Sequence, residues 1–270
     1  MPLAQLEFDG RRVRVADSGA PAADAPAVVL IHGAGHDHET WDEVAAALAG
    51  AGLRTLAPDL PGHGGSDGPA LADVGAQAGW LLRLVDALEL PRFCLAGHSM
   101  GSLTALAAAV RAPDRCTGLV LLGSMAPMPV APVLLEAARE DPPVAHALIN
   151  KWTFGPVDVL GEARLDALQA RNLRRMERQA AGSLALDLGA CDAWQDGLAA
   201  AARVRCPALL ICGERDRMTP PELAAPLFDA LHAAAGGASL IRIPGAGHAL
   251  MDEAPATVSD AIRAFVATAP

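Results

Sequence analysis

Residues 92–112 read RFCLAGHSMGSLTALAAAVRA, and this stretch decides the fold. Its first part is a short apolar run that predicts a buried strand, and from Met100 onward the apolar spacing is that of a helix. The sequence GHSMG, at 97–101, stands at the junction. A strand that turns at once into a helix crowds the backbone, so the residues two before and two after the serine need to be nearly without side chains. The pattern therefore predicts a strained turn that presents the Ser99 hydroxyl above the end of a sheet.

Strand-like and helix-like segments alternate on both sides of this turn. The N-terminal residues predict a hairpin around the two-residue turn Asp9-Gly10. Short apolar runs predict strands at 27–33, 54–58, 92–97, 118–123, 208–213 and 239–245, and apolar periodicity predicts helices at 41–49, 72–89, 100–112, 221–232 and 254–268. This alternation is typical of an α/β fold with a mostly parallel sheet covered by helices on both faces.

One long segment interrupts the alternation. Residues 125–203 contain helical patterns and no convincing strand, although they stand between two strands that we expect to be neighbours in the sheet. We therefore expect one α/β core built from residues 1–124 and 204–270. Residues 125–203 would form a helical cap at the carboxyl end of the sheet, where folds of this kind bind their ligands.

Composition narrows the possible partners. The 270 residues are 52% hydrophobic, which is ample for a core, and the net charge of −10 disfavours nucleic acid or an anionic membrane as a partner. The N-terminal stretch lacks the apolar core of a signal peptide, and five scattered cysteines form no C-x-x-C pair. We expect buried free thiols, a cytoplasmic location and a small-molecule substrate, whereas the oligomeric state stays open.

Two further polar residues follow predicted strands near the C-terminus. Asp216 comes just after the strand at 208–213, and His248 follows the strand at 239–245 in a turn of small residues. A nucleophilic serine needs a base and a group that orients the base. We therefore assign Ser99 as the nucleophile, His248 as the general base and Asp216 as the orienting acid. Glu214, two residues from Asp216, is the competing acid.

With these residues in place the chain resembles the α/β-hydrolase superfamily, in particular its capped members. The resemblance covers nearly the whole chain and rests on HGAG at 32–35, DLPGHGGS at 59–66, GHSMG at 97–101 and the acid and histidine loops. It implies the α/β-hydrolase fold, with an oxyanion hole formed by the backbone N–H groups of Ala34 and Met100. It also implies chemistry that requires no cofactor and no metal.

Departures from particular branches of the superfamily limit the reaction. Haloalkane dehalogenases and epoxide hydrolases use an aspartate nucleophile, where this chain has Ser99, and such epoxide hydrolases also use tyrosines, of which the chain has none. We therefore expect a carboxylesterase-like enzyme that cleaves a small, apolar ester. Cleavage of a C–C bond, a lactone or a thioester, and cofactor-free perhydrolysis, stay open, as does a non-catalytic receptor or scaffold of the same fold.

The sequence also suggests which residues line the substrate pocket. The residues expected there are Gly33, His36, His98, Met125, Trp152 and Trp194. Several apolar residues of the predicted cap, such as Met128 and Ile149, are expected to form its own core.

Two polar clusters remain in the sequence. His32, His36, Asp37 and His38 fall within seven residues, but their spacing fits no zinc motif, and we expect loop surface without a metal. Four arginines form one helical stripe, either solvated and paired with Glu162 and Glu177 or anchoring a substrate carboxylate. The stripe consists of Arg164, Arg171, Arg175 and Arg178.

Overall fold

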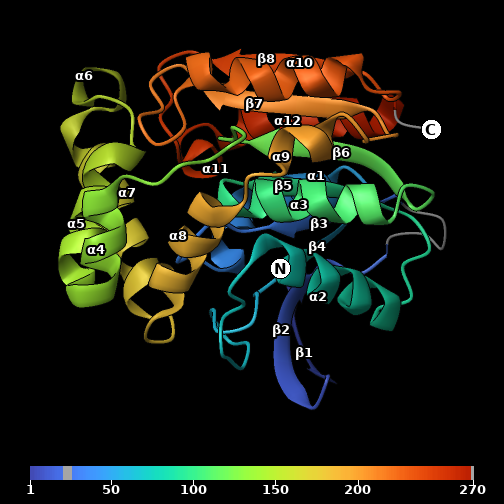
Figure 1. The fold of residues 1–270 in the computed structure, drawn as a ribbon, viewed down its shortest axis with the longest axis horizontal. Helices are drawn as coiled ribbons and strands as arrows, with labels where there is room; N and C mark the ends of the chain where they lie inside the picture. Colours follow the sequence, from blue (N-terminus) through green and yellow to red (C-terminus); the bar gives the residue numbers. More distant parts are fainter. Residues whose placement is uncertain (21–25, 269–270) are drawn as a thin grey trace.

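The computed structural model describes residues 1–20 and 26–268. An eight-stranded sheet forms its centre, with the strand order β1-β2-β4-β3-β5-β6-β7-β8 (Figure 1). β1 and β2 pair in antiparallel fashion, as do β2 and β4, and the remaining pairs are parallel. The strands are β1 Leu3–Phe8, β2 Arg11–Asp17, β3 Ala27–Ile31, β4 Arg54–Pro58, β5 Phe93–His98, β6 Cys116–Leu122, β7 Ala208–Gly213 and β8 Ala238–Ile243. The predicted fold class, a mostly parallel sheet flanked by helices, is confirmed.

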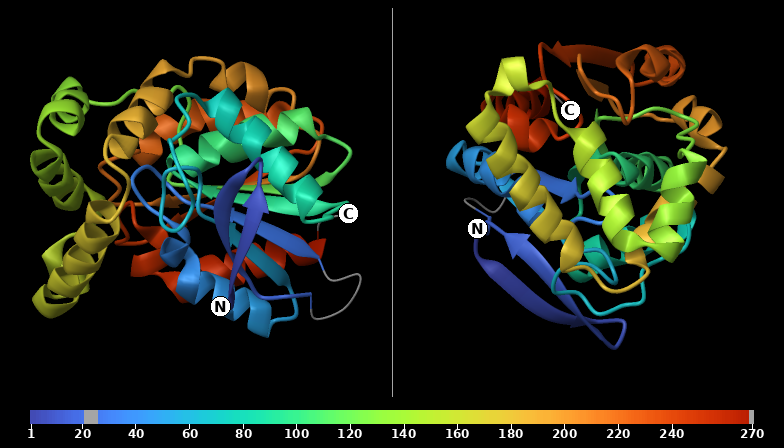
Figure 2. Two further views of the ribbon diagram at one scale, coloured as in Figure 1. Left: turned by 90° about the horizontal axis from the view of Figure 1, so that it is seen from below. Right: turned by 90° about the vertical axis from the view of Figure 1, so that its left-hand side faces the viewer.

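Helices cover both faces of the sheet because the central strands are apolar on both sides. In β3, Val28 and Leu30 pack into one core cluster with α1 and α12, whereas Val29 and Ile31 pack into another with α2 and α3. The helices of these two layers are η1 His38–Trp41, α1 Asp42–Gly50, α2 Val74–Ala87, α3 Met100–Arg111, α9 Gly197–Ala201, η2 Pro221–Ala224, α10 Ala225–Ala233, α11 Leu250–Glu253 and α12 Pro255–Thr268. Figure 2 shows the two layers on either side of the sheet.

Five helices other than α9 lie between β6 and β7. They are α4 Pro132–Glu140, α5 Pro142–Thr153, α6 Val157–Leu160, α7 Glu162–Glu177 and α8 Ser183–Ala193. α4 to α7 project beyond one end of the sheet (Figures 1 and 2). Residues of α4, α5, α7 and α8 share a small apolar cluster of their own. We call α4–α8 the helical insertion.

Both ends of the predicted cap lie on the core instead of over the site. Met125 is 5% exposed and belongs to the larger core cluster, and half-buried Trp194 packs against the same cluster. Helix α9 lies against α3 and α10, which belong to the core layer. The tight approach of Gly197 to Ala126 and Trp194 fixes this corner. The expectation that Met125 and Trp194 line the substrate pocket is therefore wrong, because the chain packs on the core at both ends of the predicted cap.

Candidate active site

The nucleophile turn has the strain that its sequence predicts. Ser99 has φ 52° and ψ −121°, between β5 and α3. A Cβ atom on Gly97 would overlap the carbonyl of Gly101, and a Cβ on Gly101 would overlap that of Ile31. The N–H of Ser99 donates to the carbonyl of Leu122 (2.9 Å), which ties the turn to the neighbouring strand β6. Glycine is therefore required at both flanks, and Ser99 lines the large cavity described below.

The acid and the base are paired as the sequence predicts. Nδ1 of His248 lies 2.8 Å from Oδ2 of Asp216. Oδ1 of Asp216 accepts the N–H groups of Met218 and Thr219, and the Thr219 hydroxyl donates to Oδ2 (2.7 Å). Burial alone would raise the pKa of Asp216, but His248 and these donors hold it below its ordinary value. Glu214, the competing acid, is exposed.

The histidine loop is held from several sides. The N–H of His248 donates to the carbonyl of Thr153 (2.5 Å), at the end of α5, and Nε2 of His98 lies 2.9 Å from the carbonyl oxygen of His248. Oε2 of Glu253 accepts the N–H groups of Gly155 and Gly247, at 2.9 Å each. Burial and the neighbouring His248 hold the pKa of His98 well below its ordinary value, so His98 is neutral. His98 therefore supports the base loop.

The loop after β3 approaches the nucleophile closely. A Cβ on Gly33 would lie 3.2 Å from Cβ of Ser99 and 3.0 Å from Nδ1 of His98. The next residue, Ala34, lines the same cavity as Ser99. Met100 is the first residue of α3, so its N–H has no acceptor within the helix. The two N–H groups expected in the oxyanion hole thus belong to the residue after Ser99 and to the loop that approaches Ser99.

Helix α8 of the insertion holds this loop. Oδ2 of Asp187 accepts the N–H of Gly35 and lies 2.8 Å from Nε2 of His63. The His63 and Asp187 side chains are each 1% exposed. Burial lowers the pKa of His63, but the carboxylate of Asp187 outweighs this and raises it. The pair connects the insertion to the loop that carries Ala34.

The cavity enclosed by these loops and the insertion has a volume of about 460 Å³. Its core-side lining includes Gly33, Ala34, His36, His98, Ser99, Thr219 and His248. The insertion and the segment leading into it contribute apolar side chains, namely Met128, Val130, Leu134, Ile149, Trp152 and Leu188. Of the six residues predicted for the pocket, Gly33, His36, His98 and Trp152 line it, and Met125 and Trp194 lie in the core packing.

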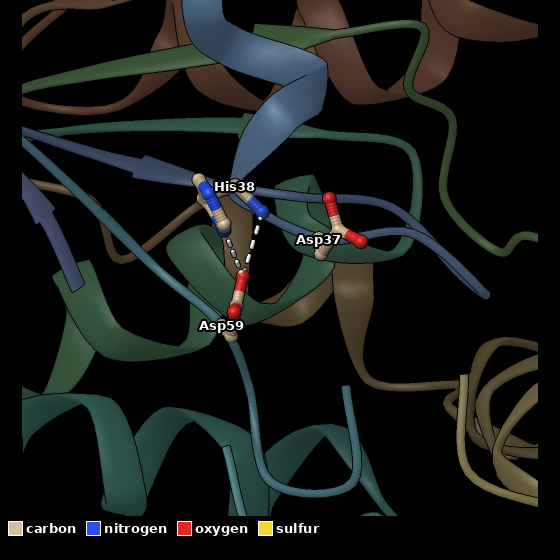
Figure 3. Close-up of side chains that lie close together, drawn as sticks. All are labelled: Asp37, His38 and Asp59. Atoms are coloured by element: carbon tan, nitrogen blue, oxygen red, sulfur yellow. Dashed lines mark hydrogen bonds and ion pairs between the residues drawn. The ribbon is translucent and has the colours of Figure 1, made fainter. Parts of the chain in front are cut away.

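The polar residues of the histidine-rich loop bind different partners, and these contacts hold the loop in place. Asp37, His38 and Asp59 have ligand atoms within 4.8 Å of one another (Figure 3). Oδ1 of Asp59 accepts from the backbone N–H of His38 and lies 2.7 Å from its Nδ1. The carboxylate of Asp37 accepts two N–H groups of Arg178. These oxygens already bind cationic or N–H donors, which is the chemistry of a loop anchor and fits poorly with a metal ligand set.

Thr219, Glu253 and Asp187 are absent from the sequence-based assignment. Thr219 lies three residues from Asp216, and a polar residue so close to a triad acid is a signal that could have indicated a support for it. Asp187 and Glu253 reach the site from distant helices, and nothing in the local sequence indicates their partners. Both were found only from the tertiary structure.

Comparison with known proteins agrees with this geometry. The family model described as the alpha/beta hydrolase family matches residues 28–261. A 2-hydroxy-6-oxononadienedioate/2-hydroxy-6-oxononatrienedioate hydrolase of Cupriavidus pinatubonensis is 30% identical, over 78% of this chain and 77% of that protein. An (E)-2-((N-methylformamido)methylene)succinate hydrolase of Acinetobacter baylyi is 27% identical, over 90% and 91%.

Solved structures show the same fold. The enol-lactonase from Burkholderia xenovorans superposes with a TM-score of 0.87 at 24% identity, covering 98% of this chain and 100% of that one. None of the helices within residues 1–20 and 26–268 combines the length and apolar character that crossing a bilayer requires. On the family match across most of its length and the shared fold, this chain belongs to the alpha/beta hydrolase family.

Proposed function

We propose that the chain is a serine hydrolase that cleaves a small, apolar ester through an acyl-enzyme. The observation that carries the proposal is the convergence of a strained Ser99 and the Asp216–His248 pair on one cavity. A strained serine turn beside a buried carboxylate–histidine pair contributes little to folding. Nucleophilic catalysis needs both, because the turn presents the hydroxyl and the pair accepts its proton.

The reaction follows from the groups around Ser99. Nε2 of His248 takes the proton from Oγ as Oγ bonds to the carbonyl carbon of the ester. The N–H groups of Ala34 and Met100 stabilise the oxyanion, and its collapse expels the alcohol, which takes the proton from His248. A water molecule then gives its proton to His248 and attacks the acyl group, and release of the acid restores the Ser99 hydroxyl.

The lining of the cavity supports an apolar substrate. The wall that the insertion contributes is mainly aliphatic, sulfur and aromatic, including Leu134, Ile149 and Trp152, and Thr153 and Asn172 are polar residues within it. A cavity of about 460 Å³ suits a small ester. These properties favour an uncharged acyl or alcohol group over a charged one.

Hydrolysis of a C–C bond is the second candidate, and one observation favours it. The Cupriavidus relative, at 30% identity, is named as a hydrolase of an oxononadienedioate. The same triad chemistry serves ester and C–C substrates, so fold and site geometry do not separate them. A dioate carries two carboxylates, and the mainly apolar wall of this cavity is the feature that ranks the ester first.

The first test is turnover of p-nitrophenyl esters of increasing acyl length, with labelling by a serine-reactive phosphonate. Ser99→Ala is expected to lower kcat by roughly 10⁴-fold or more and to abolish labelling, because the nucleophile is removed. Ser239→Ala, in the exposed edge strand β8, is the matched control and keeps both.

Each alternative result has a definite meaning. Undiminished turnover by Ser99→Ala would move the nucleophile elsewhere. Turnover of a vinylogous diketone but no ester would favour C–C cleavage. If the wild-type protein neither turns over any substrate nor takes the label, the family fold serves as a receptor or scaffold in this chain.

A further inference from the structure

His36 bridges the oxyanion loop and the helical insertion. Its Nδ1 lies 2.8 Å from the carbonyl oxygen of Ala34, and its Nε2 lies 2.6 Å from Oδ1 of Asn172 in α7. Its neighbour Ala34 carries one of the two N–H groups of the proposed oxyanion hole. His36 also lines the cavity, so it lies at the junction of loop, insertion and substrate space.

The contact with Asn172 continues as a chain of hydrogen bonds. Nδ2 of Asn172 donates to Oδ1 of Asn150 in α5 (2.7 Å). Nδ2 of Asn150 donates to the carbonyl oxygen of Gln169 (3.1 Å). The chain therefore runs from the carbonyl of Ala34, through three side chains, to the carbonyl of Gln169.

The two ends of this chain fix the direction of every bond in it. A backbone carbonyl only accepts, so Asn150 must turn its NH₂ group toward Gln169 and its oxygen toward Asn172. Asn172 must then turn its NH₂ group toward Asn150 and its oxygen toward His36. Reversing either amide alone would place like groups face to face. Nε2 of His36 must therefore carry a proton.

The other end makes the same demand on Nδ1. The carbonyl of Ala34 also only accepts, so the short contact with it requires a proton on Nδ1. A neutral imidazole has one N–H and cannot satisfy both contacts. The complete chain therefore exists only when His36 is an imidazolium cation.

The surroundings of His36 resist that charge. Burial lowers its pKa, and Arg175 of α7 lowers it further, while the hydrogen bonds to Asn172 and Ala34 and the charge of Asp37 oppose them. His146 of α5 and His98 of the nucleophile turn also feel its charge. The net direction is downward, so the imidazolium and the complete chain belong to acidic conditions.

We propose that His36 is a positioning residue whose doubly protonated form ties the oxyanion loop to helices α7 and α5. Loss of the proton leaves a lone pair of Nε2 facing Oδ1 of Asn172, so one contact breaks and the loop is held less firmly. The effect on rate rests on the proposed function, because it requires the backbone N–H of Ala34 to stabilise the oxyanion. The protonation state of His36 does not depend on that function.

The test is a titration of ¹⁵N-histidine-labelled protein by NMR from about pH 4 to about pH 8, with His36→Gln assigning the resonance. Wild-type His36 is expected to show protons on both nitrogens at the acidic end. Asn172→Asp, which supplies a charged acceptor, raises its pKa, and Asn172→Leu, which removes the acceptor, lowers it. The exposed His232, on α10, is the internal control, and its resonance is expected to be the same in all variants.

A His36 that stays neutral over the whole range, or a pKa equal in both Asn172 variants and wild type, overturns the proposal.

The rate effect is read from the pH profile. kcat falls about threefold or more as pH rises through the measured His36 pKa, and His36→Gln removes that inflection. A flat profile beside a confirmed titration overturns the positioning role. If no ester is turned over, the proposed function fails, and NMR alone decides the protonation of His36.

Discussion

At the scale of single residues, the choice between two acids shows how burial assigns a role. Asp216 is buried and accepts three N–H or O–H donors in addition to His248, while Glu214, two residues earlier, is exposed. A carboxylate so fully bonded stays ionised and fixed in direction, which is what the orientation of an imidazole requires.

Asp216→Asn is expected to lower kcat by roughly 10³–10⁴-fold, because the amide cannot stabilise the imidazolium that forms during attack. The folded state persists, since the side chain keeps its shape. Steady-state kinetics with a p-nitrophenyl ester checks this, with Glu214→Gln as the matched control that retains activity. Near-normal rates for Asp216→Asn would transfer the orienting role to another acid.

The sequence predicts best the placement of residues that follow strands. Ser99, Asp216 and His248 each come directly after a predicted strand of a parallel sheet, so their positions at one edge follow from topology. Asp187 and Glu253 also hold the site, but they reach it from helices whose docking depends on the whole tertiary structure. Local sequence carries no signal for such contacts.

At the scale of elements, helix α7 shows where sequence patterns mislead. The sequence predicts that its arginine stripe faces solvent or a substrate, but these arginines bind acids and carbonyls of the α/β core, and Arg175 is buried among them. Arg175 binds Asp252 and the carbonyl of Glu39, and Arg171 and Arg178 pair with core acids too. An amphipathic pattern shows that one side of a helix is polar, without showing what that side meets.

Arg175→Met is expected to lower the free energy of unfolding by about 1–3 kcal/mol, because Asp252 keeps only the partly exposed Arg171 as its cationic partner and the carbonyl of Glu39 loses its donor. Arg175 and Asp252 side chains are 3% and 6% exposed, so water compensates little. Urea denaturation measures the loss, and Arg174→Met, on the exposed side of the same helix, is the control with little effect. Equal stabilities of the two variants would show that the ion pair contributes nothing.

Caps and turns determine where elements begin and end, and they shift some boundaries by about two residues from those that apolar spacing predicts. Asp73 caps α2 by accepting the N–H of Ala76 (2.7 Å), so the helix begins at Val74 and not at the predicted residue 72. The strand predicted at 239–245 ends at Ile243 because Gly245 has φ 74°. Helix α8 of the insertion has no distinct apolar face, so its packing cannot be predicted from its sequence.

At the scale of the whole molecule, buried acids determine how stability responds to pH. Burial raises the pKa of Asp37, but hydrogen bonds from Arg178 and Gln179 outweigh this and lower it well below the ordinary value. An acid with a lowered folded-state pKa contributes stability above its unfolded pKa of about 4, and this is lost as pH falls. Asp216 acts in the same direction.

The unfolding free energy is therefore expected to decline as pH falls from about 5 to about 3. Asp37→Asn should lower stability at neutral pH by about 1–3 kcal/mol and make the acid decline shallower. Urea denaturation across this pH range tests both, with Asp114→Asn, an exposed acid, as the control. An unchanged acid slope in Asp37→Asn would mean that other groups cause the decline.

The helices that shape the cavity also hold the catalytic loops. The carbonyl of Thr153, at the end of α5, accepts the N–H of His248, and Asp187 of α8 accepts the N–H of Gly35. A substitution that reshapes α5 or α8 would therefore also move the loops of His248 and Ala34. Under the proposed function, selectivity and rate are coupled in this chain, and redesign of the cavity wall alone is expected to produce slow enzymes.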